Sequence, residues 1–241
     1  GLTCEALAAG RNVLCEKPLA LRLAEVEEMV AAARAADRKL AVGFKMRFEG
    51  ILAELRRLGL DGGVGPLRRV VIRHHQPVPQ QSWALAHGIL NELLIHSIDA
   101  VTWLMGDEPT RLEHRTGRER AVIALEYAGG RDALVTGAWI EGFPQIGGNN
   151  DMLIQVVGRD GHIIATRPDE ISLNTSGEAR RVRLPPSRYA DPFKREWEAF
   201  LQWIDGDGGT EIARMEDGLR VHEIIDHIER TLDRREGFTY G

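Results

Sequence analysis

The stretch Glu16-Lys17-Pro18 could do chemistry, because it places an acid and a lysine where a strand must end. It follows the apolar residues Val13 to Cys15, which are typical of a strand buried on both faces, and Pro18 cannot continue a central strand. Lys17 is therefore expected at the carboxyl end of a strand, where open α/β sheets bind ligands and where its ammonium could hold a hydroxyl or carbonyl oxygen. The alternative is a solvated loop lysine with Glu16 as its surface partner.

Glu92, His96, Asp99 and Trp103 form a second candidate group within the stretch 88–106, which is expected to be one helix. Their offsets of four, three and four place them on one helical face. A carboxylate beside a histidine can orient the imidazole and adjust its pKa, as a general base requires. The alternative is a structural histidine that its helical neighbours cap.

Alternating elements are expected to position the lysine. An alanine-rich helix is predicted over residues 23–36 and a second apolar strand over residues 40–44, followed by Arg47 and Phe48. The helical period returns from Ile51 onward, so a domain boundary is expected near Phe48.

Together these residues resemble the Gfo/Idh/MocA family of nicotinamide-dependent sugar and polyol oxidoreductases. The first part of the resemblance is the order Glu-Lys-Pro, helix, Val-Gly-Phe and Arg-Phe between residues 16 and 48. The second is the family pattern Gly-x-Leu-x-Asp-x-x-x-His-x-x-Asp with a following aromatic residue, leucine and glycine, which this chain matches at Gly88, Leu90, Glu92, His96, Asp99, Trp103, Leu104 and Gly106. The chain departs from it at Glu92, where aspartate is usual, and the extra methylene moves the carboxylate by about a bond length. The terminal helices, including Glu216 to Arg220, also resemble the family.

The resemblance implies hydride transfer between NAD or NADP and a sugar- or polyol-like hydroxyl. His96 would take the hydroxyl proton while Lys17 holds the same oxygen. The residues with expected roles are, for catalysis, Lys17 and His96; for substrate binding, Arg47, Glu92 and Trp83; and for cofactor binding, Glu16, Lys17 and Pro18. No metal is expected, because the adjacent residues His74 and His75 point to opposite faces of a predicted strand and more readily serve as loop or substrate contacts.

The family's Gly-x-Gly-x-x-Gly turn has no convincing counterpart here. Neither residues 63–65 nor residues 206–208 follow a predicted strand or have the final glycine, so neither is expected to cradle a pyrophosphate. The resemblance therefore implies the C-terminal part of a dinucleotide-binding domain at residues 1–48 and a substrate-binding and oligomerisation domain at residues 49–241. By themselves these residues are expected to bind NAD or NADP weakly or not at all. The alternative function is a non-catalytic sugar-binding or oligomerisation module derived from the family.

The expected fold is α/β with α+β: a Rossmann remnant, then a large, mostly antiparallel open sheet flanked by helices. Strands are predicted over residues 121–127, 133–141, 152–158, 162–166, 170–173 and 180–184. Two helices are predicted to follow, the first with a buried stripe of Phe193, Trp197, Phe200, Leu201 and Ile204. The predicted helices are enough for only one face of the sheet, so the other is expected to pack on a second copy in a dimer or a pair of dimers.

The composition excludes several classes of protein. The chain has 241 residues, 43% of them hydrophobic and 28% charged, so it can bury a sizeable core. No apolar run approaches the ~20 residues that span a bilayer. The net charge of −5 gives no reason to expect nucleic acid. Cys4 and Cys15 are too few for a disulfide scaffold and no secretory signal precedes them, so a reducing cytoplasm is expected.

Overall fold

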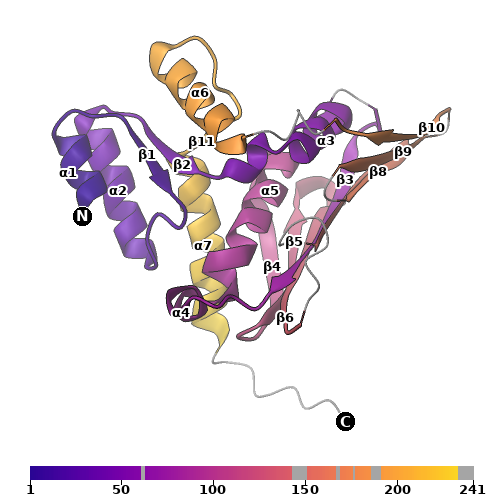
Figure 1. Cartoon of the computed structure of the whole chain (residues 1–241), viewed down its shortest axis with the longest axis horizontal. Helices are drawn as coiled ribbons and strands as arrows, with labels where there is room; N and C mark the ends of the chain where they lie inside the picture. The colour runs from indigo at the N-terminus through magenta and orange to yellow at the C-terminus, as the bar shows by residue number, and fades with distance from the viewer. Residues whose placement is uncertain (61–62, 143–150, 167–168, 176, 186–190, 233–241) are drawn as a thin grey trace.

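The computed structural model describes residues 1–60, 63–142, 151–166, 169–175, 177–185 and 191–232 (Figure 1). Its first part is a three-stranded sheet in the order β1-β2-β11. The elements of this part are α1 (Leu2–Ala8), β1 (Val13–Glu16), α2 (Leu23–Ala36), β2 (Leu40–Gly43) and β11 (Ala213–Arg214). β1 and β2 are parallel, with Val13 opposite Leu40, whereas β11 adds to β2 in the antiparallel direction.

Helix α2 follows the apolar pattern that predicted it. Its buried residues are Val26, Met29, Val30 and Ala33, at helical spacing, and it ends at Asp37 in the left-handed conformation. All four residues of β2 are buried, as a strand with both faces covered requires. Because β1 and β2 are parallel, the segments that follow them leave the sheet at the same edge, the carboxyl edge of the pair.

The second part is an eight-stranded sheet in the order β10-β9-β8-β7-β3-β6-β5-β4. Its strands are β3 (Leu67–Pro77), β4 (Pro109–Thr116), β5 (Arg120–Tyr127), β6 (Arg131–Ile140), β7 (Asp151–Gly158), β8 (Gly161–Thr166), β9 (Glu170–Thr175) and β10 (Ala179–Arg183). Every pair is antiparallel except β3 with β6, which is parallel. The mostly antiparallel open sheet flanked by helices is thus confirmed.

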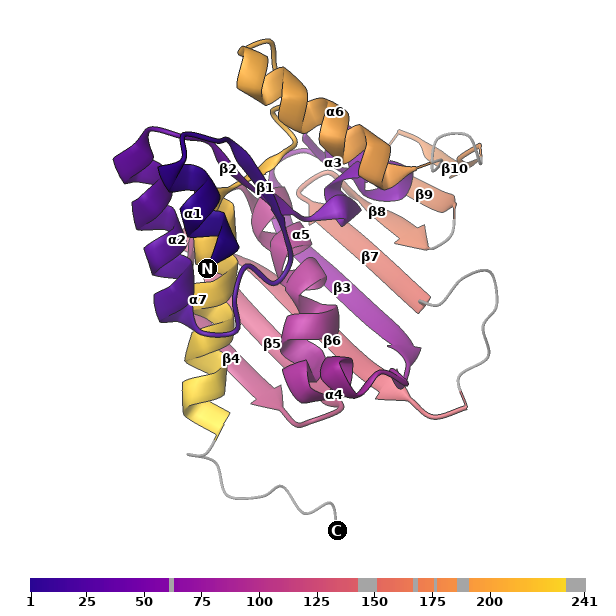
Figure 2. The ribbon, with the colours of Figure 1, turned by 60° about the vertical axis from the view of Figure 1, so that its left-hand side comes forward.

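Helices cover one face of this sheet (Figure 2). They are α3 (Gly50–Leu60), α4 (Ser82–Ile89), α5 (Ile95–Met105) and α7 (Met215–Thr231). Along β3, Val70, Ile72 and His74 are buried under these helices, whereas the alternate residues Val71 and His75 are half-buried. Within the described residues, no helix is long and apolar enough to cross a membrane.

Helix α7 joins the two parts. It packs against α2 and β2 on one side and against α5 and β4 on the other. Gly218 permits the close approach, because a Cβ there would lie 2.7 Å from Val42 Cγ2 and 2.9 Å from Leu19 Cδ1. The C-terminal part of the chain is therefore built into the sheet that the N-terminal part begins.

The helix expected over residues 88–106 is helical from Ile89 to Met105, and only Gly88 and the terminal Gly106 lie outside it. Gly88 has a φ of 74° and a ψ of 166°, so the chain breaks between α4 and the helix that holds His96. A π-helical turn, η2 (Leu90–Leu94), then leads into α5, which ends at Gly106 in the left-handed conformation. Strand β4 was not anticipated, because its short alternation of charged and apolar residues lies at the edge of the sheet.

Of the buried stripe predicted for α6 (Pro192–Asp205), Phe200 is confirmed and most of the rest is wrong. The helix is capped by Asp191, whose Oδ1 accepts a hydrogen bond from the backbone N–H of Lys194 at 2.9 Å. However, Phe193, Trp197 and Leu201 are 45%, 52% and 53% exposed, and the buried residues of α6 are Glu196, Ala199 and Phe200. The reason is that α6 lies apart from the large sheet and packs through a narrow face on the 3₁₀ turn η1 (Lys45–Phe48) (Figure 2).

Candidate active site

The predicted residues Lys17, Glu92 and His96 line one cavity of about 370 Å³. Lys17 directly follows β1 and Lys45 begins η1 just after β2, so the cavity opens at the carboxyl edge of the small parallel sheet, as open α/β sheets favour. Its other walls come from β3, η2, α5 and α6. The complete lining is Glu16, Lys17, Lys45, Met46, Glu49, His74, Gln76, Glu92, Leu93, His96 and Phe193.

Lys17 is tied to Glu92 by two contacts. Its Nζ donates a hydrogen bond to the Glu92 carbonyl oxygen at 2.9 Å and lies 3.5 Å from Glu92 Oε2. Burial lowers the pKa of Lys17, and the Glu92 carboxylate opposes that shift. The longer acid at position 92 therefore reaches the lysine, which then presents the remaining donors of its ammonium to the cavity.

His96 lies in the first turn of α5 and is 8% exposed. Its imidazole meets the Phe44 ring edge-on, with 6.5 Å between the ring centroids. The neighbouring residue Ser97 is anchored to the sheet, because its Oγ lies 3.0 Å from Nδ1 of the buried His74. This contact fixes the first turn of α5 against β3, at the place where His96 lines the cavity.

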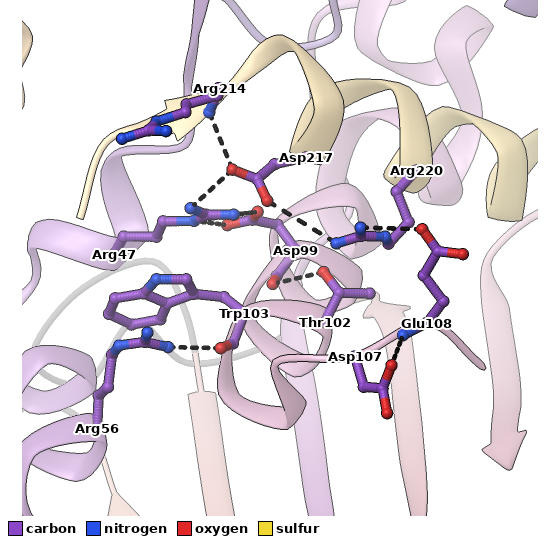
Figure 3. Close-up of polar contacts among 10 residues, drawn as sticks. All are labelled: Arg47, Arg56, Asp99, Thr102, Trp103, Asp107, Glu108, Arg214, Asp217 and Arg220. Atoms are coloured by element: carbon purple, nitrogen blue, oxygen red, sulfur yellow. Dashed lines mark hydrogen bonds and ion pairs between the residues drawn. The ribbon is translucent and has the colours of Figure 1, made fainter. Parts of the chain in front are cut away.

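Arg47 does not line this cavity. Its Nη2 lies 2.5 Å from Asp99 Oδ1, its Nε contacts both Asp99 oxygens, and its Nη1 lies 3.4 Å from Asp217 Oδ2 (Figure 3). Burial raises the pKa of Asp99 to about 6, although Arg47 pulls it down. Asp99, one of the two carboxylates that could have oriented His96, is instead held by Arg47. The predicted helical face therefore places Glu92 and His96 at the cavity and Asp99 at a separate buried ion pair.

Of the other predicted residues, Glu16 lies at the cavity and Trp83 does not. Glu16 lines the cavity, and its Oε2 accepts a hydrogen bond from the Lys17 backbone N–H at 3.3 Å. Pro18 follows a cis peptide bond after Lys17. Trp83 lies on α4, is 55% exposed and contacts His87 rather than the cavity.

Several lining residues were not selected from the sequence. His74 was expected near the end of a strand as a loop or substrate contact, and β3 continues beyond it to Pro77, so that His74 and Gln76 both line the cavity. The signal was the strand alternation, which puts His74 on the same face as Ile72. Lys45 was passed over as well; its Nζ lies 4.8 Å from the centre of the Phe193 ring of α6.

This arrangement can hold an uncharged ligand with several hydroxyl groups. Three carboxylates, Glu16, Glu49 and Glu92, supply acceptors, and Lys17 and Lys45 supply donors around the two imidazoles. Within the described ranges, no three His, Cys, Asp or Glu side chains are grouped as metal ligands.

The glycine-containing stretches do not cradle a dinucleotide. The turn at residues 63–65 leads into strand β3, and residues 206–208 follow α6, so neither opens a helix whose N–H groups could bind a pyrophosphate.

Two family models match this chain. The model of the GFO/IDH/MocA C-terminal domain matches residues 52–164, and the model of the oxidoreductase family with an NAD-binding Rossmann fold matches residues 2–44.

Known proteins are similar over most of the chain. The inositol 2-dehydrogenase of Rhizobium meliloti (strain 1021) is 26% identical over 244 residues, which cover 93% of this chain and 72% of that protein. The myo-inositol 2-dehydrogenase of Thermotoga maritima is 26% identical over 80% of this chain and 62% of its own length. The crystal structure of a proposed myo-inositol dehydrogenase from Sinorhizobium meliloti 1021 has a TM-score of 0.79 and 25% identity, over 98% of this chain and 75% of that one.

Proposed function

Because this chain belongs to the Gfo/Idh/MocA family of oxidoreductases, we propose that it acts as an NAD- or NADP-dependent dehydrogenase of a sugar- or polyol-like hydroxyl. The observation that carries the proposal is the cavity in which Lys17 and His96 meet from two elements far apart in the sequence. The names of the inositol dehydrogenases that it resembles support a polyol as the substrate class.

In this proposal His96 is the general base. It takes the hydroxyl proton as the carbon–hydrogen bond is broken, while the Lys17 ammonium donates a hydrogen bond to the same oxygen. Glu92 holds Lys17 in place through the contacts of 2.9 Å and 3.5 Å. The lysine is thus oriented before substrate arrives, which lowers the cost of reaching the reactive geometry.

The nicotinamide cofactor supplies the acceptor or donor of the hydride when it is bound. Glu16, Lys17 and Pro18 are proposed to face its nicotinamide end, which their place at the carboxyl end of β1 supports. The match of residues 2–44 to an NAD-binding Rossmann model supports the same assignment.

We further propose that the protein pairs through the face of the large sheet that no described helix covers. Apolar residues gather there on neighbouring strands, namely Val71, Leu134, Leu153, Val157 and Ile164, and all are only half-buried by this chain. The ion pairs Arg69–Asp132 and Arg73–Asp151 lie among them on the same strands.

We also propose a domain boundary near residue 48, which the gap between the two matched regions supports. A reducing cytoplasm is proposed as the location of the protein, which the free thiols of Cys4 and Cys15 support.

The test is turnover of myo-inositol and related polyols with NAD⁺ and with NADP⁺ by a form of the protein that carries a complete dinucleotide-binding domain, followed by absorbance of the reduced cofactor. His96→Ala should lower kcat by ~10²–10⁴-fold with an unchanged circular dichroism spectrum. His75→Ala is the matched control, because that side chain leaves β3 on the opposite face from His74 and lies outside the cavity.

A folded and fully active His96→Ala variant would return His96 to a structural role. If that form binds a polyol in calorimetry but turns over none with either cofactor, the non-catalytic binding module replaces the dehydrogenase.

A further inference from the structure

A second cavity, of about 490 Å³, is formed by η1, α3, α5 and α6. It shares no lining residue with the cavity of Lys17 and His96. Its lining contains four arginines and two glutamates, and is made up of Arg47, Phe48, Ala53, Arg56, Arg57, Trp103, Arg195, Glu198, Ala199, Gln202 and Glu211. The proposed dehydrogenation uses none of these side chains.

The Trp103 indole lies between two guanidinium groups in this cavity (Figure 3). The Cζ of Arg56 is 4.2 Å from the ring centre and the Cζ of Arg47 is 5.4 Å from it. Arg56 also donates a hydrogen bond from Nη1 to the Trp103 carbonyl oxygen. Stacking and this hydrogen bond hold the planar Arg56 fork in one orientation.

The two arginines differ in how their charge is balanced. Arg47 contacts the carboxylates of Asp99 and Asp217, whereas no carboxylate among the described residues lies within 4.0 Å of the Arg56 guanidinium. Burial lowers the pKa of Arg56, and the like charge of Arg47 lowers it further. The more distant acids Glu211 and Asp217 offset this only in part.

A second cationic group lines the wall opposite α3. Arg195 of α6 donates from Nη1 to the Phe48 carbonyl oxygen, which fixes its guanidinium over η1. Glu198 also lines the cavity, and its Oε1 lies 3.8 Å from Nζ of Lys194, which does not line it. An oxyanion between α3 and α6 would therefore meet cationic groups from both helices.

We propose that this cavity binds a small ligand through a phosphate or carboxylate group, with Arg56 as its principal donor. The guanidinium fork matches the oxygen pairs of both groups, and the volume is in the range of small-molecule sites. Binding would bring the missing counter-charge to Arg56 while Arg47 keeps Asp99 and Asp217.

The test is calorimetric titration of the protein with pyrophosphate and with citrate, as probes of the two oxyanion classes. We expect saturable binding of at least one probe at one site per chain, and a loss of about ten- to a hundredfold in affinity for Arg56→Gln. Arg111→Gln is the matched control, because that arginine lies on β4 and its side chain is 60% exposed. Lys17→Ala should also bind as the unchanged protein does, so this result does not depend on the proposed dehydrogenase.

A second variant tests the same cavity without changing Arg56, in case Arg56→Gln does not fold. Ala53→Glu places a carboxylate in the cavity lining on the same helix, so it should abolish probe binding without lowering the Tm measured in the absence of probe. The proposal is overturned if neither probe binds saturably, or if Arg56→Gln and Ala53→Glu, both folded, bind as tightly as the unchanged protein.

Discussion

At the scale of single residues, the contact between Lys17 and Glu92 predicts a change in pH dependence. Burial lowers the pKa of Lys17 and the Glu92 carboxylate opposes this. Glu92→Gln removes the opposition, so the ammonium should lose its proton at a lower pH and the alkaline limb of the kcat/KM profile should shift downward. Glu92→Asp keeps the charge and should shift the limb less. Identical alkaline limbs in all three proteins would contradict this role for Glu92.

Glu196 predicts a second pH effect, on stability. This acid is 2% exposed, and burial raises its pKa from 4.5 to about 8, with Glu16 adding to the shift. The folded protein therefore holds a proton that the unfolded chain releases above pH ~4.5, so stability is lost as pH rises from there to about 8. Glu196→Gln should raise the Tm by an amount that grows between pH 5 and 8 and then levels off.

Thermal unfolding across this pH range measures the effect. Glu198→Gln is the control, since its side chain is 55% exposed on the same helix and should give a Tm difference that does not vary with pH. A constant Tm difference for Glu196→Gln would show that this carboxyl is already ionised in the fold.

Sequence patterns located the candidate site better than they assigned its residues. Lys17 and His96 could be found because a proline-terminated strand and a helical spacing are local signals. Arg47 could not be assigned, because its partners Asp99 and Asp217 lie 52 and 170 positions away and only the folded chain brings them together. Glu196 was overlooked because a glutamate at helical spacing does not reveal that its helix buries it.

At the scale of elements, the Arg47 cluster joins η1, α5 and α7. Because both Arg47 and Asp99 are buried, Arg47→Ala leaves an uncompensated carboxylate and should cost about 3–5 kcal/mol of unfolding free energy. Urea unfolding measures this cost, and the double variant with Asp99→Asn should recover part of it. A cost below about 1 kcal/mol would mean that the cluster does not hold these elements together.

Patterns within an element also have a limit, which α6 illustrates. The spacing of its apolar residues predicted the helix correctly. It did not predict the buried face, since Trp197 and Leu201 are exposed and Glu196 is buried. Periodicity shows that a helix has an apolar face, and only the neighbouring elements decide which face is covered. The eight-stranded sheet was more predictable, because alternation and turns are repeated along it.

At the scale of the whole molecule, the uncovered sheet face predicts association. Light scattering at micromolar concentration should give at least a dimer, and Val71→Asp, in the central strand β3, should shift it toward monomer. Leu21→Asp is the control, because Leu21 is 48% exposed but lies before α2, away from the large sheet. A monomeric unchanged protein would refute the pairing.

Cofactor affinity is a second property of the whole molecule. The polypeptide of residues 1–241 offers contacts to the nicotinamide end but no described helix start for the pyrophosphate, so its dissociation constant for NAD or NADP should not be submillimolar. Calorimetric titration of this polypeptide with each cofactor measures it. A micromolar constant would mean that other groups hold the phosphates.

The pairing of β11 with β2 bears on the order in which the protein folds. During synthesis β1 and β2 are made before β11, so their sheet lacks the strand Ala213–Arg214 until later, and α7 follows that strand. This closure spans about 170 positions, the kind of distant contact that slows folding. The nascent chain would therefore expose the apolar surface of β2 while the residues between β2 and β11 are made, and during that time chaperones have the opportunity to bind it.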